Sequence, residues 1–116
     1  MLPRTLRLSS TRDFDRAYQK GEQFITRNMR VFRLQAARAK NQNQSRFGFV
    51  VSKKQGQGIA QKNRIKRKLR NLIFLNLKAI PQGSDYVILA KRGIEQASFE
   101  ELNGEFLELL RKLKKS

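Results

Sequence analysis

The sequence predicts an α/β (α+β) two-layer sandwich, in which helices pack on a mixed sheet in the order α-β-β-α-β-α. Short continuous apolar runs at 47–51 and 85–90 are typical of buried strands. Apolar residues recur with a helical period at 60–79 and 99–113. The length of 116 residues suits one hydrophobic core, so we expect a single domain over 1–116.

The first predicted element is a short helix that follows an extended lead-in at 2–8. Ser10 and Asp13 have the spacing of a capping box, which favours a helix start at this point. Phe14 and Tyr18 fall on one face of that helix, because residues four apart lie above one another. Gly21 is expected to end it.

Two strands are expected in the next part of the chain. Residues favourable to strands recur between arginines at 24–37, which we interpret as one strand, straight or bent. The polar segment 39–45 has the composition of a hairpin loop. The following strand, 47–51, is expected to be covered on both faces and leads into Ser52-Lys53-Lys54.

A long helix is predicted from about residue 60 to about residue 79, and Pro81 and Gly83 are expected to stop it. Ile65 and Leu69 lie four apart inside its most basic stretch. That spacing predicts an apolar stripe that docks the helix, with the cations outside the stripe. After the strand at 85–90, a second capping box at 98–101 begins the last helix.

The net charge of +17 comes from 26 Lys and Arg against nine Asp and Glu. No acidic residue falls between Gln23 and Ser84, a stretch that holds 15 of the basic residues. Self-repulsion of this size opposes folding unless a polyanion neutralises it. The asymmetry favours a nucleic-acid surface in the middle of the chain.

The chain has no Cys and no His. Disulfides, thiolate nucleophiles, histidine bases and the usual zinc sites are therefore excluded. The carboxylate pairs Asp13/Asp15 and Glu100/Glu101 are explained by their places near helix N-termini and not by a catalytic role. No apolar run has the length of a membrane span, and no apolar segment of the secretory type follows the basic start. We expect a cytoplasmic protein without membrane contact or organic cofactor.

The segment Lys62-Asn-Arg-Ile-Lys-Arg-Lys-Leu-Arg70 is the first candidate site. Arginine can hold a phosphate with two parallel hydrogen bonds, and asparagine can bond to sugar or base edges. A solvated helix face is the ordinary alternative, but no acid is near in sequence to pair with these cations. We therefore favour phosphate contact, with Lys53 and Lys54 beside the same polyanion.

Aromatic residues form a second candidate site, because bases of a single strand stack on exposed rings. Core packing is the favoured interpretation of Phe47 and Phe49. For Phe14, Tyr18 and Phe32 both interpretations stay open. Cations on the same predicted strand as Phe32 would suit a groove for single-stranded nucleic acid; these are Arg27, Arg30 and Arg33.

Nearly the whole chain resembles the bacterial ribonuclease P protein subunit. The most specific likeness is Asn63-Arg-Ile-Lys-Arg67 after a strand that ends in Ser-Lys-Lys. The other matching elements are Leu6-x-Leu8, Asp13-Phe14, Gly21, Phe47-Gly-Phe-Val-Val-Ser-Lys-Lys54, Leu69-Arg70, Asp85-Tyr-Val-Ile-Leu-Ala90 and the last helix.

The resemblance implies an α/β sandwich with an unusual left-handed βαβ crossover. It also implies an endoribonuclease whose catalyst is an RNA subunit with Mg²⁺ bound mainly by that RNA. The protein would bind this RNA and the 5′ leader of precursor tRNA, without catalytic or metal-binding residues of its own and without an obligatory protein partner.

The site residues are also carried over from the resemblance. The RNA-subunit surface would comprise Lys62, Asn63, Arg64, Lys66, Arg67, Lys68 and Arg70. The leader cleft would comprise Phe14, Tyr18, Arg27, Arg30, Phe32, Lys53 and Lys54. The family commonly has Arg where this chain has Lys62, and lysine keeps the charge but lacks the planar fork of donors.

Two other functions use the same cations. A ribosomal protein or general RNA-binding chaperone would bind RNA without a leader cleft, so its affinity would not depend on a leader. A DNA-binding architectural protein is a weaker alternative, which a comparison of RNA and DNA affinities at matched salt would distinguish.

Overall fold

The computed structural model describes residues 7–8, 10–35, 45–51, 58–81 and 83–115. Three α-helices, four strands and two short 3₁₀ turns follow one another in this part of the chain. In order they are α1 (Thr11–Lys20), β1 (Glu22–Ile25), β2 (Met29–Gln35), β3 (Arg46–Val50), α2 (Ile59–Leu75), η2 (Leu77–Ala79), β4 (Ser84–Ala90), η3 (Ile94–Gln96) and α3 (Phe99–Lys115).

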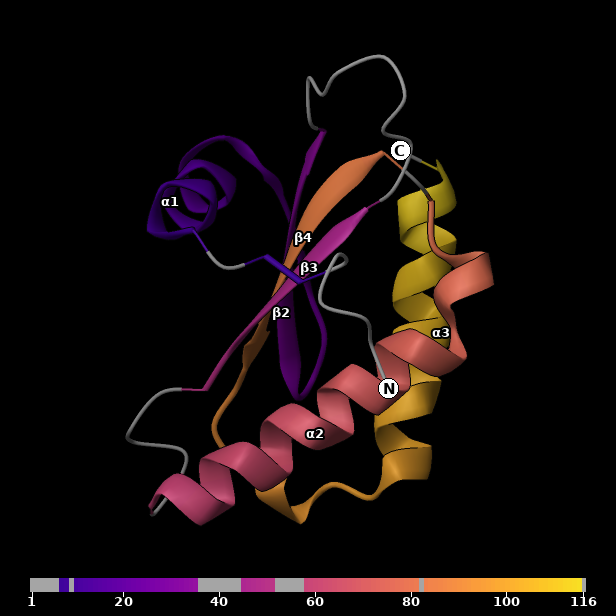
Figure 1. The fold of residues 1–116 in the computed structure, drawn as a ribbon. Helices are drawn as coiled ribbons and strands as arrows, with labels where there is room; N and C mark the ends of the chain where they lie inside the picture. Colours follow the sequence, from indigo (N-terminus) through magenta and orange to yellow (C-terminus); the bar gives the residue numbers. More distant parts are fainter. Residues whose placement is uncertain (1–6, 9, 36–44, 52–57, 82, 116) are drawn as a thin grey trace.

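The strands form one mixed sheet in the order β1-β2-β4-β3. β1 with β2 and β2 with β4 are antiparallel, whereas β3 and β4 are parallel neighbours joined through α2. Figure 1 shows α1 on one side of this sheet and α3, with α2 beside it, on the other. The expected α+β class is confirmed, with α1 added on the face that α2 and α3 leave free.

The prediction of a single strand at 24–37 is wrong, because the chain forms a hairpin there. β1 and β2 are separated by a turn at 26–28, which the Thr26 N–H closes by donating to the Met29 carbonyl at 2.8 Å. Glu105 of α3 accepts hydrogen bonds from the Thr26 hydroxyl at 2.7 Å and from the Asn28 backbone N–H at 2.9 Å. A carboxylate 77 residues or more away thus satisfies the polar groups of the turn, which no local pattern reveals.

The prediction of a hairpin between the strands expected at 24–37 and 47–51 is also wrong. β4 lies between β2 and β3, so these two strands are not neighbours. Six of the seven β4 residues are buried, which suits a central strand whose two faces are both covered. Ser45 fastens the start of β3 to this strand, because its hydroxyl accepts from the Ser84 N–H at 3.3 Å.

Two apolar clusters cover the two faces of the sheet. The larger lies between the sheet and α2 with α3, and includes Phe47 stacked on Tyr86 with ring centroids 5.4 Å apart. The smaller lies under α1 and is built on Leu8, Ala17, Phe32 and Val87. Phe47 is buried and Phe49 is partly buried against the larger cluster, so their interpretation as core residues is confirmed.

The helix ends differ from one another in how they are capped. Ser98 and Glu101 form the predicted capping box, with bonds of 3.1 and 3.2 Å between side chains and backbone N–H groups. Ser10 is the N-cap of α1, but its side chain makes no capping bond, and the Asp13 carboxylate pairs with Arg46. α2 ends at Leu75, earlier than expected, and η2 continues the segment to residue 79.

Candidate RNA-binding surfaces

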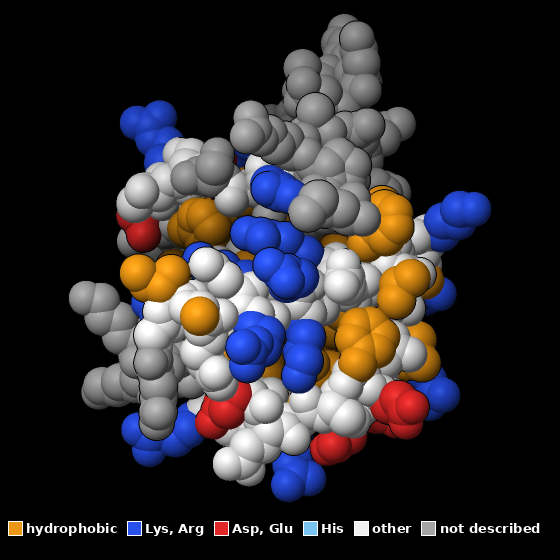
Figure 2. All heavy atoms as spheres, turned by 60° about the horizontal axis from the view of Figure 1, so that its bottom comes forward, with side chains coloured by type: hydrophobic (Ala, Val, Ile, Leu, Met, Phe, Trp, Pro, Cys, Tyr) orange, Lys and Arg blue, Asp and Glu red, His pale blue; other side chains and the backbone are white. Residues whose placement is uncertain are grey.

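The first candidate surface is the outer face of α2. Ile65 and Leu69 are 4% and 0% exposed, so the predicted stripe docks this helix. Asn63, Arg64 and Arg67 are exposed on the opposite side. In Figure 2, Lys and Arg side chains gather across the centre of the face that carries α2, and acidic side chains lie at its margins. The remaining predicted cations are half-buried along the helix flanks: Lys62, Lys66, Lys68 and Arg70.

These cations have few partners within the protein. Among the residues that the structure describes, no Lys or Arg of α2 forms an ion pair with a carboxylate. Lys68 differs from the others, because its ammonium donates to the carbonyl of Ala97, between η3 and α3, at 3.2 Å. Six of the seven predicted residues therefore remain available on the surface of α2.

Arg70 lies close to two other cations, Arg7 and Arg67. Its pKa is lowered from the ordinary value by partial burial and by the charges of Arg7 and Arg67. Its Nε atom is buried and lacks a hydrogen-bond partner in the described part of the chain. Sequence analysis missed Arg7, which lies beside Phe47 of β3 through an isolated bridge. An anion would relieve the repulsion among these three guanidinium groups.

The second candidate surface is the sheet face under and beside α1. Residues in register across neighbouring strands point to the same face. Their pairing gives three successive rows across this face. The rows are Leu34–Asp85–Arg46, then Gln23–Phe32–Val87–Gly48, then Ile25–Arg30–Leu89–Val50.

α1 covers the first two rows. Asp13 reaches Arg46 in the first row at 3.2 Å. Tyr18 meets Phe32 of the second row edge to face, with ring centroids 5.0 Å apart. A side chain at Gly48 would overlap the Phe14 ring, so only glycine lets α1 lie this close. Burial, and then the charge of Asp15, raises the pKa of the Tyr18 phenol.

The third row lies beside α1 and is more open. Ile25 is 49% exposed, and Val50 and Leu89 are half-buried. The Nε atom of Arg30 is buried without a hydrogen-bond partner among the described residues. A cation set among apolar side chains, beside the half-buried Phe14 and the 38% exposed Tyr18, can bind a phosphate while bases contact the rings.

The structure does not bring all of the predicted cleft residues together. Arg27 lies in the β1–β2 turn, where it lines a cavity of about 340 Å³ against α3. Arg33 points to the α3 side of the sheet and donates to Glu22 at 2.6 Å and to the Leu113 carbonyl at 3.0 Å. Lys53 and Lys54 lie outside the described residues.

Phe32 is 9% exposed, so it serves mainly as the floor under Tyr18. Sequence analysis missed the apolar members of the third row, which are Ile25, Val50 and Leu89. Each of these residues lies on the α1 face of its own strand, but only the register between strands brings the three side by side. Register depends on β4 lying between β2 and β3, which the sequence pattern does not indicate.

Other chemistry has little support in the described ranges. No three His, Cys, Asp or Glu side chains converge there on a possible metal site. No helix in those ranges is both long enough and apolar enough to cross a membrane.

Residues 2–114 match the family model described as Ribonuclease P. A ribonuclease P protein component of Finegoldia magna is 33% identical over 96% of this chain and 93% of its own length. One of Lactococcus lactis is 34% identical over 95% of this chain and 89% of its own length.

Solved structures agree with these relatives. The RNase P protein of Staphylococcus aureus superposes with a TM-score of 0.77 at 26% identity, covering 95% of each chain. The RNase P protein of Thermotoga maritima gives a TM-score of 0.79 at 25% identity and covers 91% of this chain and 96% of its own. The expected resemblance is confirmed over residues 2–114, which include both candidate surfaces. The chain belongs to the ribonuclease P protein family.

Proposed function

We propose that this protein binds the catalytic RNA subunit of ribonuclease P through the outer face of α2. The observation that carries the proposal is a helix docked on the core through Ile65 and Leu69, whose cations have no acidic partners in the described part of the chain. Guanidinium groups suit an RNA backbone, because their planar fork of donors loses less side-chain entropy for each hydrogen bond formed with phosphate. Lys62 contributes charge to this surface, while Arg64 and Arg67 supply the forked contacts.

We propose further that the 5′ leader of precursor tRNA lies along the third sheet row beside α1. Arg30 would bind a leader phosphate, and Phe14 and Tyr18 would contact bases. Arg27 would act only at the edge of this site, because it lies in the turn beyond the row. Lys53 and Lys54 would also bind leader phosphates.

The protein on this proposal supplies binding and not bond cleavage. The RNA subunit, with Mg²⁺ that it holds itself, would hydrolyse the bond between leader and tRNA. The protein would screen phosphate repulsion and lengthen the contact with substrate. On this proposal the protein acts in the cytoplasm, and its partners are the RNA subunit and precursor tRNA.

Reconstitution of the protein with a ribonuclease P RNA tests the proposal. We expect no cleavage of precursor tRNA by the protein alone, and leader removal when RNA and Mg²⁺ are added at low salt. Cleavage by the protein without RNA would contradict it. Equal affinity of the assembled enzyme for substrates with and without a leader would favour a general RNA-binding chaperone.

Two single variants test whether the surfaces are separate. Arg64→Ala is expected to weaken affinity for the RNA subunit by about tenfold, because one charge-assisted contact is worth about 1.5 kcal/mol. Phe14→Ala is expected mainly to reduce the preference for substrate with a leader. Thermal unfolding of each variant controls for loss of fold, and equal effects of both variants in both assays would contradict two surfaces.

A further inference from the structure

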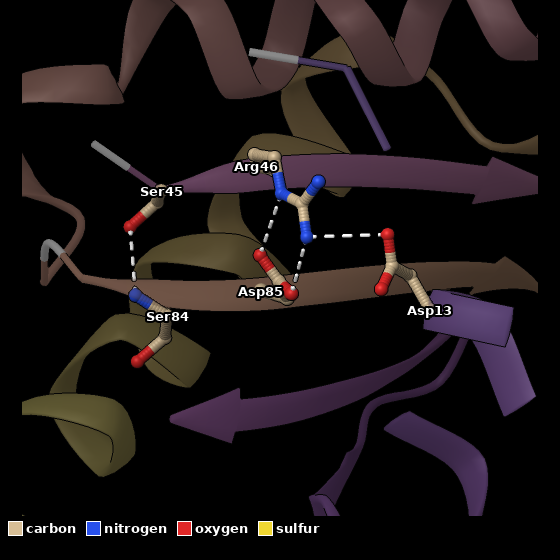
Figure 3. Close-up of polar contacts among 5 residues, drawn as sticks. All are labelled: Asp13, Ser45, Arg46, Ser84 and Asp85. Carbon is tan, nitrogen blue, oxygen red and sulfur yellow. Dashed lines mark hydrogen bonds and ion pairs between the residues drawn. The ribbon is translucent and has the colours of Figure 1, made fainter. Parts of the chain in front are cut away.

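Three charged residues from three elements meet at the covered end of the α1 face (Figure 3). Arg46 of β3 donates to both carboxylate oxygens of Asp85 on β4, at 3.1 and 3.0 Å. The same Nη2 atom lies 3.2 Å from a carboxylate oxygen of Asp13 on α1. One cation therefore serves two anions, and the contact with Asp13 joins the helix to the sheet.

The two carboxylates that contact Arg46 differ in how much they depend on it. The Asp85 side chain is 5% exposed, so it needs its forked partner to offset the cost of burial. The Asp13 side chain is 19% exposed and could be solvated if α1 moved away. Asp13 is thus an additional partner of a cation that Asp85 already requires.

The placement of α1 needs such a contact. A helix of 10 residues is marginal by itself in water. Its apolar contact with the sheet is a small cluster, in which Ala17 is the only fully buried α1 residue within the described ranges. Asp13 fixes the first turn of α1, Phe14 follows it directly, and Tyr18 lies one further turn along.

We propose that the Asp13–Arg46 ion pair positions α1 so that Phe14 and Tyr18 stand at the edge of the third row. Asp13 is a positioning residue that acts through the helix and does not touch RNA. The inference rests on the proposed leader site. It predicts that an acidic side chain favours the binding of an anionic strand, which is opposite in sign to its direct electrostatic effect.

Asp13→Asn tests this proposal, because it removes one charge, keeps the side-chain volume and leaves Arg46 paired with Asp85. An Arg46 variant would leave Asp85 buried and unpaired, and loss of fold would then obscure the result. The matched control is Asp15→Asn, which removes the same charge from an exposed position two residues further along α1. The readout is the ratio of affinities for precursor tRNA with and without leader, measured on the assembled enzyme.

We expect Asp13→Asn to reduce this ratio by about fivefold, because the amide oxygen can still accept from Arg46 but the charge that strengthens this contact is lost. Asp15→Asn should leave the ratio unchanged or raise it, because it only removes repulsion. Affinity for the RNA subunit should change less than about twofold in both, since α2 lies on the other side of the sheet. Asp13→Glu, whose longer carboxylate can still reach Arg46, should restore part of the ratio.

The outcomes separate this inference from the proposed function. No leader preference in the unaltered protein would overturn the proposed leader site itself. A leader preference that Asp13→Asn leaves unchanged, or changes as Asp15→Asn does, would overturn the positioning role alone. A similar loss of affinity for the RNA subunit in Asp13→Asn would also overturn it, because that loss indicates general unfolding.

Discussion

At the scale of single residues, the packing of α1 on the sheet depends on one missing side chain. Gly48 sits in the second sheet row, and the ring of Phe14 occupies the space that a Cβ would fill. Its φ is not in the left-handed region, so the need for glycine here is close approach and not backbone conformation. The glycine in the sequence motif Phe47-Gly-Phe therefore determines how closely α1 packs on the sheet.

Gly48→Ala is expected to displace Phe14 and to lower the free energy of unfolding by about 1–3 kcal/mol, as overpacking does. Leader preference should fall at the same time, while affinity for the RNA subunit should not. The matched control is Gly104→Ala on α3, where a Cβ meets nothing within 4 Å. That variant should gain about 0.5–1 kcal/mol, because alanine favours helix. Denaturant unfolding measures both, and two variants of equal stability would contradict the packing argument.

Tyr86 gives a prediction for alkaline pH. Its buried phenol donates to the Pro81 carbonyl at 2.7 Å, and burial raises its pKa above 10.0, against the opposing effect of Arg33. Above about pH 10 the unfolded chain releases this proton before the folded protein does, so the free energy of unfolding falls as pH rises. Tyr86→Phe should lose about 1 kcal/mol near neutral pH and show a flatter decline above pH 10. Parallel curves for the two proteins would contradict this assignment.

At the scale of elements, the helices followed from sequence more closely than the strands. The spacing of Ile65 and Leu69 predicted the docked face of α2, because helical contacts are made by residues that are near in sequence. The β1–β2 turn was missed because Glu105, on a distant helix, satisfies it. Strand order was missed for a related reason, since β4 enters between two strands that are earlier in the chain.

The docked and outer faces of α2 should separate stability from binding. Leu69→Ala is expected to lower the free energy of unfolding by about 2–5 kcal/mol, because the side chain is 0% exposed. Arg67→Ala, two residues earlier and exposed, should change it by less than about 0.5 kcal/mol and yet weaken binding of the RNA subunit. Unfolding and RNA affinity would be measured on the same samples. Loss of stability in both variants would contradict the docked-stripe model.

At the scale of the whole molecule, charge pointed to nucleic acid but did not indicate where the proposed leader site lies. The acid-free middle of the chain contributes α2 and three of the four third-row residues, Ile25, Arg30 and Val50. The charge pattern therefore does not distinguish one surface from the other. That division comes from the sheet, which puts α1 on one side and α2 with α3 on the other (Figure 1). Arg33 and Arg30 illustrate it, because they are three residues apart and face opposite sides.

The net charge of +17 predicts that salt acts in opposite directions on folding and on binding. Screening weakens self-repulsion more than it weakens the few ion pairs, so the free energy of unfolding of the free protein should rise from about 0.05 M to about 0.5 M salt. Affinity for the RNA subunit should fall over the same range, because the release of counterions into a more concentrated salt solution is less favourable. Arg67→Gln should reduce the slope of log affinity against log salt by about 1. A protein that salt destabilised would also bind RNA less tightly, so thermal unfolding is measured at each salt concentration. If the stability of the free protein falls as salt rises, the loss of affinity is due to unfolding, and the charge argument is contradicted.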